Sequence, residues 1–291
     1  MHRSLTRICR QNISHNISRR GLAAAAVATA CMLCASGSAS AQGRLDGRYV
    51  ATLAGVPVGE STWVIDIGED QFSAVATSMT TGLLRMFAAS DGITTSRGTV
   101  RGDNLSPTLF VSTARSDNQV EEVKLVMSAG VVKDMLVEPP TVPHSGLVPV
   151  MEAHRRSVVD PLSAALIRVR GTDDPVGAEA CRRTLPVFNG HLRFDLQLSF
   201  NRIETVHPQR GYQGPVAVCT VRFVPIAGHV SDNPAIEYLA AAPDNEMWLA
   251  PIAGTRVVVP YRISIPTPLG RGVLEATQFV TTASRAGAAS R

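Results

Sequence analysis

The polar side chains with the most regular spacing are Arg193 and Asp195, two residues apart on the polar side of an alternating segment. Arg222 and Arg262 hold comparable positions in two other alternating segments. In a curled sheet this polar face lines a groove. On an outer surface the same residues form a ladder of cross-strand ion pairs, each contributing roughly a few tenths of a kcal/mol. The ladder is the interpretation that we favour.

Motifs for established catalytic chemistries are missing from the sequence. Gly59–Trp63 begins like the Gly-x-Ser-x-Gly nucleophile elbow of serine hydrolases but ends in Trp. Gly270–Gly272 lacks the third glycine and the following helix of a dinucleotide-binding loop. Of the seven histidines, the five beyond residue 41 are scattered without the spacing of metal ligands: His144, His154, His191, His207 and His229. The sequence therefore predicts no catalytic residues, no cofactor and no metal site.

The first 41 residues have the composition of a cleavable export signal. An Arg-rich start precedes an apolar run, Gly21–Cys34, of about 14 residues, whereas a membrane-spanning helix needs about 20. The sequence from Ala39 to Ala41 then matches a cleavage site. We expect cleavage near Ala41, a periplasmic location and no transmembrane segment in the mature chain. Ser18–Leu22 partly matches a twin-arginine signal, and the general secretory route is the alternative that we favour.

Removal of residues 1–41 changes both the charge and the cysteine count. Five of the 28 basic residues leave, so 23 basic residues face 24 acidic ones and the formal charge becomes −1. Without an excess or a cluster of Lys and Arg, nucleic acid is not an expected partner. Of the cysteines, Cys181 and Cys219 remain, and an oxidising compartment favours a disulfide between them. A free redox-active thiol is the alternative, although neither cysteine has neighbours that predict a lowered pKa.

Period-two alternation dominates the chain after residue 41. It is clearest in the segment 191–200 and repeats in the segments 256–265, 63–67 and 122–128. Weaker candidates are the segments 49–53, 72–76, 216–224 and 273–280. Such alternation is typical of antiparallel sheets with one buried face, so we expect at least eight strands.

Turn and helix signals punctuate these strands. Asn189-Gly190 precedes the clearest strand and predicts a hairpin with a type I′ turn. Asp160-Pro161 predicts a helix start, and the apolar spacing that follows extends this helix to Arg170. Asn233-Pro234 starts a shorter helix through about Ala241. We expect a single β-rich domain over residues 42–282 and a flexible tail over residues 283–291.

Several segments resemble the exported bacterial DUF3108 family. The similarity covers Tyr49 with Ala54–Gly59, Asp160–Ala164, Val187–Leu196, Cys219 and Pro225–Gly228. Its most specific part holds Asn189, Gly190, Arg193 and Asp195, with Asn189 where the family more often has Asp. Because the family has no known function, the resemblance implies an envelope location and motif positions of unknown role. By analogy of fold alone, it also implies a curled antiparallel sheet wrapped around a helix, similar to envelope carrier proteins.

Together these observations predict a mainly β fold, with a curved antiparallel sheet that forms an open barrel or a β-spiral and one or two short helices packed against it. The Asp160–Arg170 helix is expected on the concave side, and a flat two-sheet sandwich is the alternative. Because a curled sheet forms an apolar cup, we expect a non-enzymatic periplasmic protein that binds a hydrophobic ligand, such as a lipid, or an envelope protein. A periplasmic hydrolase acting on a cell-wall or lipid substrate is the competing hypothesis, which a pocket shared by Asp195 and a histidine would favour.

Overall fold

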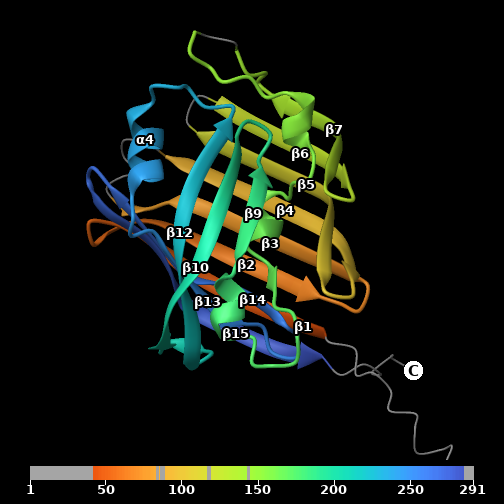
Figure 1. Cartoon of the computed structure of the whole chain (residues 1–291). Coiled ribbons are helices and arrows are strands. Elements are labelled where there is room, and N and C mark those ends of the chain that lie inside the picture. Colours follow the sequence, from red (N-terminus) through yellow and green to blue (C-terminus); the bar gives the residue numbers. More distant parts are fainter. Residues whose placement is uncertain (1–41, 83–84, 86–88, 117–118, 143–144, 285–291) are drawn as a thin grey trace, which may run out of the picture. The chain divides into compact units, whose positions relative to one another are not determined.

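The computed structural model describes residues 42–82, 85, 89–116, 119–142 and 145–284 (Figure 1). These residues form fifteen strands of a single sheet, in which only β11 and β15 pair in parallel. The prediction of a mainly antiparallel β fold is therefore confirmed. The last strand extends through Ser284, two residues into the predicted tail. The predicted signal, residues 1–41, and the tail residues 285–291 lie outside the described residues.

The order of the strands across the sheet is β7-β6-β5-β4-β3-β2-β1-β15-β14-β13-β12-β10-β9, and β8 and β11 pair with β14 and β15 beside this path. Six of the eight predicted strand segments lie wholly within strands, and the other two, 191–200 and 256–265, begin two residues before β10 and one residue before β14. The strand bounds are β1 (Gln42–Leu53), β2 (Val56–Ile67), β3 (Gln71–Thr80), β4 (Ser90–Arg101), β5 (Asn104–Ser116), β6 (Gln119–Ser128), β7 (Val131–Glu138), β8 (Ile167–Arg168), β9 (Arg183–Phe188), β10 (Arg193–Val206), β11 (Arg210–Gly211), β12 (Gly214–Ala227), β13 (Glu246–Pro251), β14 (Val257–Thr267) and β15 (Gly270–Ser284).

The sheet curls around a first core cluster. This cluster buries side chains from strands that are far apart in the sheet order, among them Leu45 on β1, Leu125 on β6 and Phe188 on β9. Figure 1 shows β9, β10 and β12 crossing β2 to β5 at a steep angle. Since β7 and β9, the two ends of the path, do not pair with each other, the sheet is curved but not closed. The predicted open barrel is observed, and the flat two-sheet sandwich is not.

The short helices whose bounds are described lie between or beside the strands, and they are η3 (Glu152–Arg155), α2 (Pro161–Ala164), α3 (Ala178–Cys181) and α4 (Pro234–Ala241). Within the described part of the chain, no helix has both the length and the apolar character needed to cross a bilayer. The predicted helix from Pro234 to Ala241 is present with the expected bounds, and the Asn233 side chain accepts hydrogen bonds from the first turn of its backbone.

The predicted Asp160–Arg170 helix is correct in its start and position but not in its length. Asp160 caps α2, and α2 contacts both β4 and β9, so it lies on the concave side of the sheet. The helix ends at Ala164, because Ile167 and Arg168 form β8 and gain sheet hydrogen bonds to β14. The apolar residues of this segment also belong to different cores, because Leu162 lies in the first core cluster and Ile167 lies in a second one.

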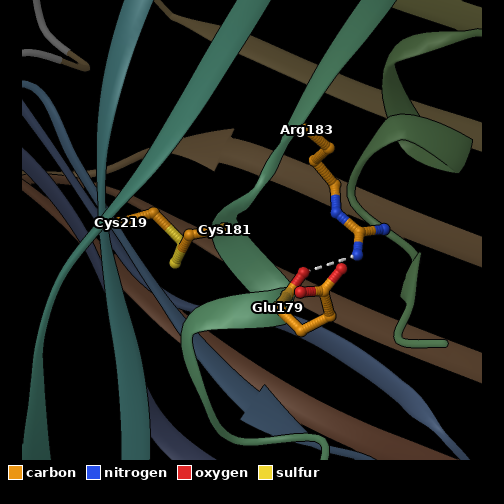
Figure 2. Close-up of a disulfide and its surroundings, with 4 residues drawn as sticks. All are labelled: Glu179, Cys181, Arg183 and Cys219. Atoms are coloured by element: carbon orange, nitrogen blue, oxygen red, sulfur yellow. Dashed lines mark hydrogen bonds between the residues drawn. A yellow bond between two sulfur atoms is a disulfide. The ribbon is translucent and has the colours of Figure 1, made fainter. Parts of the chain in front are cut away.

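The second core cluster is smaller and contains the disulfide. Cys181 of α3 and Cys219 of β12 are fully buried, with their Cα atoms 5.4 Å apart. The disulfide, drawn in Figure 2, confirms the pairing predicted from the sequence. It links α3 to the sheet beside an otherwise apolar set of buried side chains, which are Ile167, Val169, Ala180, Leu198, Ala217, Val221, Met247, Leu249 and Val258.

Candidate functional site

The β9–β10 turn contains the most specific family-motif residues, and its structure differs from the prediction. The hairpin is present, but four residues, Asn189–Leu192, connect the strands. The Asn189 Oδ1 accepts hydrogen bonds from the backbone N–H groups of His191 (2.9 Å) and Leu192 (2.6 Å). Of the Asn189-Gly190 pair only Gly190 has a positive φ, +101°. The prediction of a type I′ turn is therefore wrong. The Asn189 side chain instead stabilises a longer turn by accepting the two backbone hydrogen bonds.

This turn packs against the opposite end of the sheet. A Cβ atom on Gly190 would lie 2.5 Å from the Val123 Cγ1 of β6, and the His191 Nε2 is 3.1 Å from the Glu121 Oε1. Gly228 approaches the same turn so closely that a Cβ atom there would lie 1.8 Å from the His191 oxygen. We call this contact between residues 189–192, β6 and Gly228 the seam. Gly190 and His191 thus contact β6, and Asn189 stabilises the turn that brings them there.

Arg193 and Asp195 form an ion pair within one strand. The Arg193 Nη1 lies 2.6 Å from the Asp195 Oδ1, and the two side chains are 12% and 22% exposed. Arg262 instead stacks over the Trp248 ring at 5.0 Å and pairs with Glu275, while Arg222 stands opposite Gln197 in the sheet register. Among the described ion pairs, none joins Arg222 or Arg262 to Asp195.

The polar groups give no observation in favour of a hydrolase. Among the described contacts, Asp195 meets Arg193 and no histidine. His144 lies outside the described residues. In the part of the chain that the structure describes, no group of three or more His, Cys, Asp or Glu side chains is arranged to hold a metal ion.

Asp160 is the one fully buried carboxyl group among the described residues. Its Oδ1 accepts from the N–H groups of Leu162 and Ser163, and its Oδ2 accepts from the Ser96 hydroxyl at 3.0 Å. Burial raises the pKa of Asp160, and these hydrogen bonds oppose the rise. Because the cluster joins α2 to β4 and contains no base, we assign it a structural role.

The most apolar pocket described lies beneath α4. It has a volume of about 220 Å³, and Leu239 of α4 covers one side. The sheet supplies its remaining apolar lining through Leu196, Val221, Phe223, Met247, Ile263 and Ile265. No residue of α4 is buried, so the helix is a lightly packed cover.

A single buried acceptor adjoins this apolar lining. Asn245 is 4% exposed and lines the pocket. Its Nδ2 donates to the Ala242 carbonyl at 3.2 Å, whereas its Oδ1 is buried without a hydrogen-bond partner. A buried acceptor left unpaired costs about 1–3 kcal/mol, which a ligand hydroxyl would recover. The alternating pattern of the sequence predicts the apolar strand faces that line this pocket. It does not predict that α4 covers them.

Comparison with protein families finds a match over residues 48–277 to the model described as "Protein of unknown function (DUF3108)". No curated protein matches the chain. Among solved structures, the chain is similar to a beta-barrel-like protein of domain of unknown function DUF1849 from Brucella abortus. That match has a TM-score of 0.47 and 9% identity, and it covers 82% of this chain and 98% of the other.

Proposed function

The chain belongs to the DUF3108 family, whose function is unknown, and from its own geometry we propose that it binds a hydrophobic ligand without transforming it, in the apolar pocket beneath α4. The observation that carries the proposal is the combination of a mainly apolar wall with one unpaired acceptor beside it, the Asn245 Oδ1. The other polar residue of the lining, Glu246, is paired with Arg202 and Trp248. Pockets that bind small molecules commonly combine an apolar lining with a few polar groups that set orientation.

Both parts of the pocket contribute to the expected selectivity. Burial of an alkyl chain contributes roughly 25 cal/mol for each Å² of apolar surface removed from water. A hydroxyl or protonated carboxyl group at the end of that chain would donate to the Asn245 Oδ1. The ligand class is therefore an aliphatic molecule with one neutral hydrogen-bond donor at its end, and the pocket of about 220 Å³ holds a short chain or one end of a lipid.

The proposed location differs from the concave cup expected from the sequence. The concave side holds α2 and the first core cluster, where Phe188 is fully buried and Tyr49 is 2% exposed. The pocket beneath α4 is lined instead by residues of the second core cluster, such as Val221 and Met247. We therefore place the ligand beside the second core cluster.

We also propose that the protein works in the periplasm after cleavage near Ala41. The buried Cys181–Cys219 disulfide supports this, because disulfides persist in oxidising compartments. N-terminal sequencing of protein recovered from the periplasm should begin near Gln42; a chain that still starts at Met1 would contradict the proposal.

The ligand proposal is tested by titration with the neutral fluorescent probe N-phenyl-1-naphthylamine. Leu239→Trp should fill the pocket from the lightly packed α4 and weaken binding about tenfold or more. Tyr238→Trp is the matched control, because it places the same side chain on the exposed neighbouring position of α4, where Tyr238 is 42% exposed. Saturable binding lost only in Leu239→Trp supports the proposal, and equal binding by all three proteins, or none by the wild type, contradicts it.

A second titration tests the role of Asn245. 1-Octanol and 1-chlorooctane have the same chain length, but only the alcohol donates a hydrogen bond. The wild type should be displaced from the probe at lower concentrations of the alcohol, by about fivefold or more. Asn245→Leu keeps a similar volume and should remove that preference; a preference that survives the substitution would exclude the Asn245 Oδ1 as the acceptor.

A further inference from the structure

Four arginines line one pocket of about 230 Å³ next to the disulfide-bonded helix α3. Two of them, Arg168 and Arg170, follow α2, and two, Arg182 and Arg183, follow Cys181. No sequence pattern indicates a cluster of basic residues, because the two pairs are separated along the chain. The pairing of β8 with β14 and the position of α3 bring the two pairs together.

Acidic residues do not balance this positive charge. The pocket contains four arginines and two acids, Asp103 and Glu179. Glu179 pairs with the exposed Arg182 at 3.5 Å, and Asp103 is 3.9 Å from the Arg168 Nε, near the limit of an ion pair. Among the described residues, no carboxylate lies within ion-pair distance of Arg170 or Arg183. The pocket thus has a formal excess of two positive charges.

Arg183 is held in place by neutral backbone acceptors. Its Nη1 donates to the Arg168 carbonyl at 3.0 Å and its Nη2 to the Glu179 carbonyl at 2.9 Å, the contact drawn in Figure 2. Burial is the main cause that lowers the pKa of Arg183; the Glu179 carboxylate opposes this, and the positive charge of Arg170 adds to it. The guanidinium is therefore fixed in a position where its charge is poorly compensated.

Two guanidinium N–H groups in this pocket also lack acceptors. The Nε atoms of Arg168 and Arg183 are buried without a hydrogen-bond partner. A buried donor left unpaired is unfavourable, and charged donors cost more than neutral ones. An anion in the pocket would supply acceptor oxygens and compensate the excess charge at the same time.

We propose that this arginine pocket binds a phosphate group. A phosphate monoester carries about −1.5 to −2 charges at pH 7 and three acceptor oxygens, which matches the excess of two charges and the several guanidinium donors better than a carboxylate does. At about 30 Å³ for each water in the liquid, the volume holds a phosphate with the first atoms of its ester substituent. The inference is independent of the apolar pocket, which has a different lining.

The test is calorimetric titration of the mature protein with inorganic phosphate and with glycerol 3-phosphate, and sedimentation with phosphatidylcholine vesicles with and without phosphatidic acid. Arg170→Gln and Arg182→Gln alter exposed side chains, so the fold should be kept, which circular dichroism checks. Each should weaken phosphate binding about tenfold or more. Arg48→Gln, an exposed arginine of β1, is the control and should bind like the wild type.

The outcomes separate the possible sources of the phosphate. Equal binding of the two soluble ligands supports a site for free phosphate, and tighter binding of glycerol 3-phosphate supports a site for a phosphate ester. Sedimentation only with phosphatidic acid vesicles, if Arg170→Gln abolishes it, supports a lipid headgroup. No binding in any arm, or binding that Arg170→Gln and Arg182→Gln do not weaken, overturns the inference.

Discussion

The seam and the surroundings of the second core cluster differ in how tightly they are packed. At the seam there is no free space, because Gly190 and Gly228 are in contact with Val123 and with the His191 backbone. Around the second core cluster lie two pockets, a buried amide oxygen and two guanidinium N–H groups without partners. A region whose polar groups are paired stabilises the fold, whereas a region with unpaired buried groups has free energy to gain from a ligand.

The Cys181–Cys219 disulfide should stabilise the second core cluster, to which both cysteines belong. Replacing both Cys181 and Cys219 by Ala should lower the free energy of unfolding by about 4 kcal/mol, because the unfolded chain regains the entropy of a loop closed over 38 residues. Urea denaturation measures this loss, and the reduced wild type should match the variant. A loss below about 1 kcal/mol would mean that the second core cluster holds together without the disulfide.

The seam should be sensitive to a single methyl group. Gly190→Ala places a Cβ atom 2.5 Å from the Val123 Cγ1 at a φ of +101° and should cost about 3 kcal/mol, from backbone strain and overpacking together. Gly102→Ala is the matched control, with a φ of +54° and no atom within 4 Å. It should cost only about 1 kcal/mol.

Both costs are measured by urea denaturation. Equal losses for the two variants would show that the close packing at Gly190 is not what stabilises the seam, and the contrast between the two regions would disappear. Phosphate binding should persist in Gly190→Ala, since the seam does not line the arginine pocket.

A smaller effect is expected at Asp160, on the concave side. Because burial raises the pKa of this carboxyl group above 3.8, its contribution to stability is fully present below pH 3.8 and is lost as the pH rises through the folded-state pKa. Asp160→Asn keeps an oxygen that can cap α2 and does not titrate.

The free energy of unfolding of the wild type relative to Asp160→Asn should therefore fall as the pH is raised from 3.5 to 7. Urea denaturation at several pH values provides the comparison. A difference that stays constant would show that the hydrogen bonds to Asp160 balance burial, and one that rises with pH would show that they outweigh it; either result would contradict the prediction.

Local patterns were sufficient for most of the fold. Alternation predicted the strands because one face of each is buried, and the two cysteines that follow the predicted export signal predicted the disulfide. The helix after Asp160 was predicted too long because a helical period does not reveal that Ile167 and Arg168 pair with β14. Sheet pairing over such a sequence distance overrides local propensity.

The candidate sites were much harder to predict. Asn189 and Gly190 stand out in the sequence, but their roles in the structure are local. Asn189 accepts hydrogen bonds within the turn, and Gly190 allows the turn to pack closely against Val123. Arg183 and Asn245 carry no local signal, because an unpaired buried donor or acceptor arises only from how distant segments meet. Alternation placed Arg193 and Asp195 on one face, but their pairing within a strand depends on side-chain geometry that the pattern does not contain.

The central claim is that the pocket beneath α4 holds a hydrophobic ligand, and native mass spectrometry of the protein purified from the periplasm tests it most directly. We predict that the wild type and Tyr238→Trp carry a small apolar molecule and that Leu239→Trp, with its pocket filled, does not. Bare protein in all three preparations, or the same bound molecule in all three, would contradict the account.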